Sequence, residues 1–133
     1  TSFSEFAVKE FENISAALRE ILDLSYQAFS GNDLIAARKT EPLEQVIDNL
    51  KDTYRTRHIL RLQKGDCSVN AGFIWSDILS YIERVSDHCS NISGCVIDAA
   101  EQNMNTHQNL RIFRNSDEDF KQDFNAFSAR YSI

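Results

Sequence analysis

Proline and glycine are scarce in this chain, with one Pro and four Gly among 133 residues. Both residues interrupt regular structure and dominate turns, so their scarcity disfavours a turn-rich β fold and favours long helices. Hydrophobic residues make up 42% of the chain, an ordinary share for a globular protein, which argues against disorder. The length suits one hydrophobic core, so we expect residues 1–133 to form a single domain.

Cysteine pairs, long hydrophobic runs and excess positive charge are also lacking. The three cysteines, Cys67, Cys89 and Cys95, have no Cys-x-x-Cys spacing, so we expect free thiols in a reducing compartment, with Cys89 in the core. No apolar run approaches about 18 residues, so we expect neither a membrane-spanning helix nor a signal peptide. The formal net charge of −6 disfavours nucleic acid and anionic membranes as partners and is compatible with cation binding.

Apolar residues recur at steps of three and four, which predicts an all-α bundle of three long helices plus a C-terminal helix. The first helix is expected over residues 2–29 and the third over about 74–102. Between them, residues 33–64 are expected to form a short helical piece, a kink at Pro42 and a main helix from about Leu43.

The third predicted helix carries the clearest apolar stripe, with alternating steps of four and three. This spacing predicts a face that packs against neighbouring helices along its whole length. We therefore expect a carboxylate at Ile82 or Ile92 to unfold the domain. On the same helix, Gly94 is either a point of close helix approach or a tolerated glycine. The stripe consists of Ile78, Ile82, Val85, Cys89, Ile92, Val96 and Ala99.

Aromatic residues dominate the last predicted helix, which follows a short helix around Leu110 and Phe113. Asn115 and the acids after it resemble a helix start, because acidic side chains suit the positive end of the helix dipole. The aromatic stripe has helical spacing, which is more typical of a core face than of a cofactor site. It comprises Phe120, Phe124, Phe127 and Tyr131.

Two predicted helices carry the same acidic pattern, Glu44-x-x-x-Asp48 on the second and Glu83-x-x-x-Asp87 on the third. Residues four apart share a helix face, so each pair presents two carboxylates close together. Such like-charge pairs cost roughly 0.2–0.5 kcal/mol each, a cost that a bound cation would remove. Because Asp87 lies opposite the apolar stripe, a solvated acidic face is the plainer interpretation.

A turn centred between Cys67 and Ser68 would place the two acidic patterns side by side. In such an antiparallel hairpin, residues whose numbers sum to 135 lie level. Oxygen-only ligands suit hard cations such as Mg²⁺, Ca²⁺, Mn²⁺ or ferric iron. The same rule places His58 level with Asp77, for which we prefer a structural hydrogen bond. The level acidic and amide pairs are Asp48 with Asp87, Glu44 with Asn91 and Asp52 with Glu83, and Glu41 lies one turn away.

The third predicted helix contains a recognisable motif. Residues 83–92, Glu-Arg-Val-Ser-Asp-His-Cys-Ser-Asn-Ile, resemble the E-R-I/V-x-D-H-x-x-N-I signature of PhoU-like domains. Glu44-x-x-x-Asp48 matches the other acidic motif of that family. Further stretches resemble the version found at the C-terminus of bacterial sodium/phosphate cotransporters, namely residues 58–62, 65–67, 77–79 and the tail from 107.

The resemblance implies a three-helix-bundle core that regulates phosphate uptake from the cytoplasmic face of a membrane transporter. The implied partners are the membrane-embedded portion of the same polypeptide, other regulatory proteins and a second copy of the chain. PhoU proteins have two bundles with paired acidic motifs that can hold iron or other metals, whereas this chain has one pair of motifs. The carried-over ligands of iron, Mn, Mg or Ca are Glu44, Asp48, Glu83 and Asp87, with Glu41, Asp52 and Asn91 as additional candidates.

Two other function classes remain as alternatives. A ferritin-like di-iron enzyme needs inward Glu-x-x-His pairs, and a serine hydrolase of the common kind needs a Gly-x-Ser-x-Gly turn. The chain contains neither pattern, so we expect no enzyme. A free-standing helical adaptor that acts through protein contacts is the second alternative.

Overall fold

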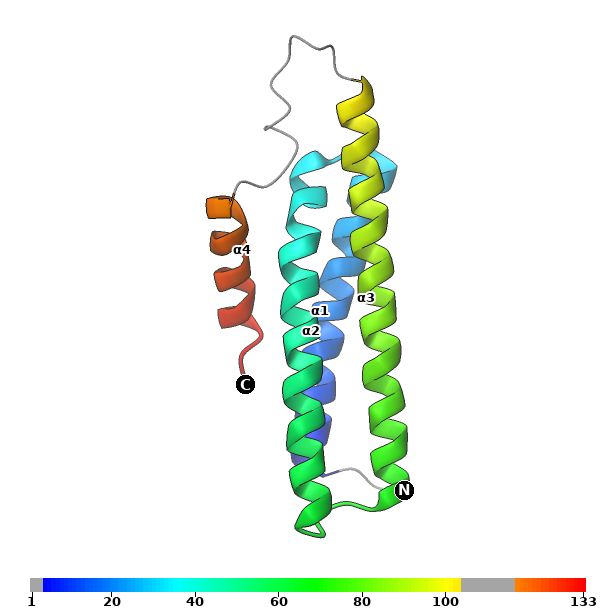
Figure 1. The fold of residues 1–133 in the computed structure, drawn as a ribbon, viewed down its shortest axis with the longest axis vertical. Coiled ribbons are helices and arrows are strands. Elements are labelled where there is room, and N and C mark those ends of the chain that lie inside the picture. Colours follow the sequence, from blue (N-terminus) through cyan, green and yellow to red (C-terminus); the bar gives the residue numbers. More distant parts are fainter. Residues whose placement is uncertain (1–3, 104–116) are drawn as a thin grey trace.

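The computed structural model describes residues 4–103 and 117–133, and this part of the chain consists of four helices without a strand. Helices α1, α2 and α3 lie side by side, and α4 lies beside α2 (Figure 1). The predicted all-α bundle is therefore confirmed, while the expected short helix around Leu110 and Phe113 falls outside the described residues. The helices are α1 (Glu5–Gly31), α2 (Leu34–Gln63), α3 (Val69–Asn103) and α4 (Asp117–Arg130).

Side-chain caps set where the long helices begin. Ser4, Asp33 and Ser68 precede α1, α2 and α3, and each accepts a hydrogen bond from the backbone N–H three residues further on. Such a cap satisfies one of the N–H groups that the first turn of a helix leaves unpaired. Because Ser68 provides this cap, α3 begins at Val69, earlier than the sequence predicted.

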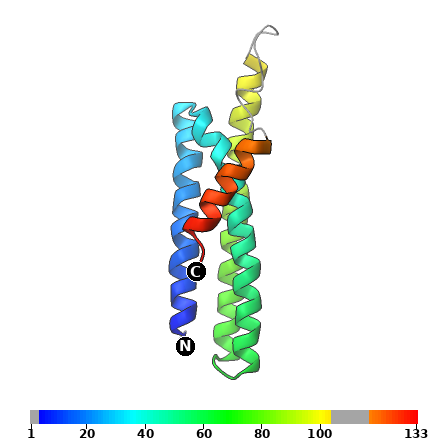
Figure 2. The ribbon, with the colours of Figure 1, turned by 90° about the vertical axis from the view of Figure 1, so that its left-hand side faces the viewer.

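Pro42 lies inside α2 instead of dividing it. The helix is continuous from Leu34 to Gln63, so the short piece and the main helix expected from the sequence are parts of one helix. Proline removes only one hydrogen bond of the helix ladder, and Pro42 is buried, so packing retains the helix around it. The first turns of α2 are inclined to the remainder of the helix in Figure 2.

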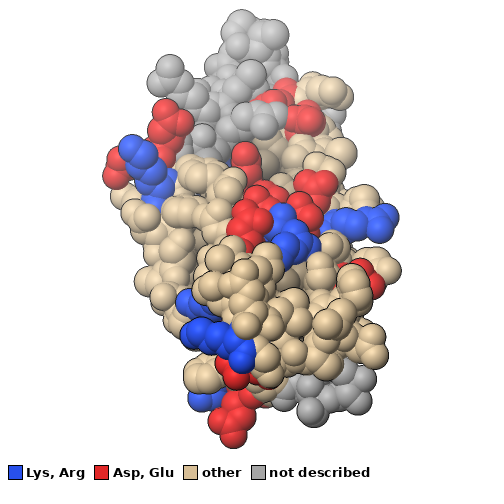
Figure 3. All heavy atoms as spheres, turned by 60° about the horizontal axis from the view of Figure 1, so that its bottom comes forward, with Lys and Arg blue, Asp and Glu red and all other residues tan. Residues whose placement is uncertain are grey.

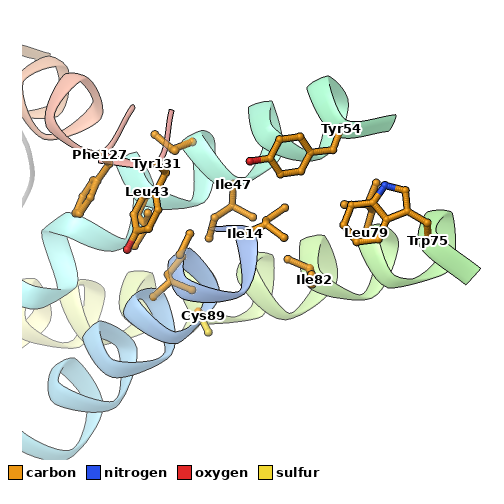
Figure 4. Packing of buried hydrophobic residues seen from close by; sticks show 13 residues of the cluster. Ile14, Leu43, Ile47, Tyr54, Trp75, Leu79, Ile82, Cys89, Phe127 and Tyr131 are labelled. Atoms are coloured by element: carbon orange, nitrogen blue, oxygen red, sulfur yellow. The ribbon is translucent and has the colours of Figure 1, made fainter. Parts of the chain in front are cut away.

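Apolar side chains from all four helices form the core, part of which Figure 4 shows. The predicted stripe of α3 is only partly correct, because Val85 and Ile92 are more than one-third exposed. Ser86 and Ser93 are buried in their place, so the helix is rotated from the expected orientation. The buried face of α3 comprises Ala71, Gly72, Trp75, Leu79, Ile82, Ser86, Cys89, Ser93 and Ile97.

Helix α4 is attached to the bundle at its C-terminal end. Phe127 and Tyr131 belong to the core, as the aromatic stripe predicted, and Phe124 packs against it. Asn13 of α1 donates to the Tyr131 carbonyl at 2.6 Å and to the Tyr54 hydroxyl at 2.8 Å. These contacts explain why α4 crosses obliquely over α1 and α2 in Figure 2.

The structure also bears on the predictions made for the cysteines and for membrane-spanning helices. Cys89 is a buried thiol, as expected, whereas Cys95 is exposed and all three cysteines are free. None of the helices in residues 4–103 and 117–133 is long and apolar enough to cross a membrane.

We predict that Ile82→Asp unfolds the domain and that Ile92→Asp does not. Ile82 is 6% exposed, so an unpaired carboxylate there costs several kcal/mol, comparable with the stability of a small domain. Ile92 is 43% exposed, and its carboxylate would remain hydrated. Urea unfolding followed by circular dichroism measures both variants, and equal losses of stability would show that the two positions are not distinct.

We predict opposite effects for alanine at two glycines of α3. A Cβ at Gly72 would lie 2.7 Å from Nε2 of the buried His58, so Gly72→Ala should destabilise the domain by about 1–3 kcal/mol. Apart from the backbone of its own helix, no heavy atom lies within 4 Å of a Cβ at Gly94, so of the two interpretations the tolerated glycine holds and close helix approach does not. Gly94→Ala should therefore stabilise α3 by roughly 0.5–1 kcal/mol. Thermal unfolding of both variants measures the difference, and a stabilising Gly72→Ala would contradict the packing described.

Candidate functional site

The turn between α2 and α3 sets the register of the two helices. Gly65 has a φ of +75°, a left-handed conformation that glycine adopts without strain. Arg55 of α2 donates to the Ser80 hydroxyl of α3 at 2.9 Å, and these residue numbers sum to 135. The antiparallel hairpin is therefore confirmed, and this contact agrees with the predicted register.

This register gathers carboxylates from both helices into what we call the acidic cluster, comprising Glu41, Glu44, Asp48, Asp52, Glu83 and Asp87. Figure 3 shows acidic side chains gathered around a basic one near the middle of one face of the molecule. The four ligands predicted from the resemblance lie close enough to influence one another. Burial raises the pKa of Glu44, and the negative charges of Asp48 and Asp87 raise it further, followed by those of Glu41 and Glu83.

The ammonium group of Lys51 lies among these carboxylates. Its Nζ is 2.9 Å from Asp48 Oδ1, 3.4 Å from Glu83 Oε1 and 3.5 Å from Asp52 Oδ1. The Lys51 side chain is only 11% exposed, whereas those of its three partners are 34–68% exposed. Lys51 therefore connects α2 to α3 with its charge turned toward the acidic cluster.

Opposing influences act on the pKa of Lys51. Burial lowers the pKa, but the hydrogen bond to Asp48 and the charges of Asp48, Glu83 and Asp52 together raise it above its usual value. The carboxylates stabilise the ammonium form by more than burial destabilises it. Lys51 is consequently a positive charge at neutral pH.

The position of Lys51 was not predicted from the sequence, although a signal was present. Lys51 lies four residues after the buried Ile47 and three before the buried Tyr54, so it occupies the inner face of α2. It also follows Asp48 by three residues, a spacing that allows an ion pair on one helix.

The acidic cluster does not fit a metal ion in this arrangement. Two of the four candidate ligands, Asp48 and Glu83, are directed at the Lys51 ammonium. Within residues 4–103 and 117–133, no group of three or more His, Cys, Asp or Glu side chains converges as metal ligands would. The additional candidates Glu41, Asp52 and Asn91 are exposed, as is Asp87.

His58 is a buried residue on α2. Its ring packs against Gly72, and both ring nitrogens lie 3.9 Å from the Cys67 sulfur. Burial lowers the pKa of His58, and the nearby charge of Arg61 lowers it further. Among the described residues no hydrogen bond joins His58 to Asp77, so that predicted pairing is wrong.

Comparison with known proteins decides the family. The sequence model of the PhoU domain matches residues 11–96, which include both acidic motifs. The chain belongs to the PhoU domain family. The resemblance inferred from residues 83–92 is thereby confirmed, and the all-α PhoU-like bundle agrees with it.

This PhoU domain is also similar to a named protein, the phosphate-specific transport system accessory protein PhoU homolog 1 of Thermotoga maritima. The two are 24% identical over 90 residues, which is 68% of this chain and 39% of that protein. The chain therefore spans about two fifths of the length of this relative. No solved structure matches the present chain significantly.

We predict that Glu44→Gln stabilises the PhoU domain at neutral pH. The pKa of Glu44 is raised above its ordinary value of 4.5, so the folded state disfavours ionised Glu44. Removing the charge should contribute roughly 0.2–0.5 kcal/mol for each like-charge neighbour. The gain should disappear as the pH falls through the raised pKa to below 4.5, where Glu44 is protonated in both states. Urea unfolding across this pH range tests the prediction, with the exposed Glu12→Gln as the matched control, and a gain independent of pH would contradict it.

Proposed function

We propose that this PhoU domain regulates phosphate uptake as the cytoplasmic domain of a sodium-dependent phosphate transporter. The observation that carries the proposal is the PhoU match over residues 11–96. The Thermotoga maritima relative is named as an accessory protein of phosphate-specific transport, which supports a role in phosphate regulation. The transporter context has separate support, since residues 58–62, 65–67 and 77–79 resemble the cotransporter version of the domain.

The domain acts in this proposal by binding and not by catalysis. Large aromatic side chains are strongly exposed on α1 and α3, including Tyr26, Phe29 and Phe73. Between these helices lies an apolar recess of about 210 Å³, lined by Ala7, Val8, Phe11, Trp75 and Ile78. Val8 and Phe11 line this recess and are themselves exposed, and contiguous exposed apolar surface is typical of contact sites. We propose that the α1–α3 face contacts the membrane-embedded portion of the same polypeptide.

A free-standing adaptor is the second candidate, because the same exposed apolar face suits a separate protein partner. The complete reading frame would distinguish the two candidate functions. Several hydrophobic segments ahead of Thr1 support the transporter, and a reading frame without them supports the adaptor.

We predict that unfolding this domain within the full-length protein abolishes the response of phosphate uptake to phosphate supply. The measurement is sodium-dependent uptake of radioactive phosphate by cells grown with low and high phosphate. Ile82→Asp should remove the difference between the two growth conditions, because it disrupts the core of the domain.

The matched control is Ile92→Asp, which adds the same charge to the same helix at an exposed position. It should leave the response intact, provided that immunoblotting shows equal amounts of both variants in the membrane. An unchanged response in Ile82→Asp at equal abundance would contradict a regulatory role for the domain.

A further inference from the structure

The position of Lys51 requires a physical explanation, because lysine is almost never buried unless its charge is paired. Lys51 lies on the inner face of α2, between the buried Ile47 and Tyr54. Its side chain is 11% exposed, and its ammonium reaches the acidic cluster and not bulk water. The cluster therefore provides the compensation that burial of this charge demands.

The ammonium has the partners that a bound cation would have. A lysine ammonium carries three N–H donors and acts as a compact point charge. Three carboxylate oxygens surround it within 3.5 Å, from Asp48 and Asp52 on α2 and from Glu83 on α3. The same charge thus neutralises repulsion within α2 and links α2 to α3.

A hard metal ion and Lys51 would compete for the same oxygens. Metal binding requires carboxylate lone pairs directed at the ion, whereas Asp48 and Glu83 are directed at the ammonium. A positive charge within a few ångströms also repels a divalent cation. Binding of both at once is therefore unfavourable.

We propose that Lys51 is the built-in cation of the acidic cluster, and that Glu44, Asp48, Glu83 and Asp87 do not hold a hard metal ion while the Lys51 ammonium occupies Asp48 and Glu83. The tethered ammonium is always present at the cluster, so it holds α2 and α3 together at any metal concentration. This proposal does not depend on the regulatory function proposed above.

The experiment compares the metal response of the parent chain with that of Lys51→Met. Unfolding temperature and isothermal titration are measured with Mn²⁺ and with Mg²⁺ after treatment with chelator. Without metal, Lys51→Met should be less stable than the parent, because the acidic cluster then lacks a counter-charge. With Mn²⁺, its unfolding temperature should rise, and its affinity should exceed that of the parent by about tenfold or more.

Three matched variants identify the cause of a response. Lys121→Met removes one exposed lysine from α4 and should behave like the parent. Lys51→Arg keeps the positive charge and should remain insensitive to metal. Adding Asp48→Asn to Lys51→Met should remove the gained response, because Asp48 is both a partner of the ammonium and a candidate ligand.

Two outcomes would overturn the proposal. Equal metal affinity of the parent and Lys51→Met would show that the ammonium does not exclude metal. Absence of a metal response in both would show that the acidic cluster is not a cation site apart from Lys51. If Lys51→Met and Lys51→Gln are both unfolded without metal, refolding on addition of Mn²⁺ supports the proposal, and failure to refold overturns it.

Discussion

The packing of α2 against α3 in one antiparallel register determines where the other features of this PhoU domain lie. A short turn containing Gly65 joins the helices, so little freedom remains for one to slide along the other. This register brings Arg55 to Ser80 and Lys51 to Glu83, and it packs Gly72 against His58. The acidic cluster is thus a consequence of the hairpin, with contributions from motifs far apart in the sequence.

The sequence predicted the helices and the register but not the rotation of α3. Apolar residues cover more of this helix than the part that faces the core, so two overlapping stripes compete for burial. The structure buries Ser86 and Ser93 and leaves Val85 and Ile92 partly exposed. Small side chains at a helix contact allow the axes to approach, because the distance between helices depends on the side chains between them. The spacing of apolar residues alone does not show whether the close approach of two helices at small side chains is more favourable than the burial of larger apolar groups.

The carboxylates of the candidate site were predicted from the sequence, but the cation between them was not. The spacing of Glu44, Asp48, Glu83 and Asp87 was sufficient to place these carboxylates near one another. Lys51 was not foreseen, because a lysine in a sequence is ordinarily expected in water. Its charge is compensated by Asp48 and Asp52 on its own helix and by Glu83 on α3, and the contact with Glu83 is a tertiary effect that the sequence of α2 alone does not contain.

The three faces of the bundle are chemically different, and this difference bears on how the domain recognises partners. Helix α4 covers part of the α1–α2 face, where Phe127 and Tyr131 complete the core and Arg130 donates to Glu20. The α2–α3 face carries the acidic cluster with its internal cation, and the α1–α3 face carries the apolar recess. A partner that binds by apolar burial therefore finds a recess on the α1–α3 face. A partner with positive charge finds the α2–α3 face, where Lys51 already neutralises part of the negative charge and so limits the attraction to any further cation.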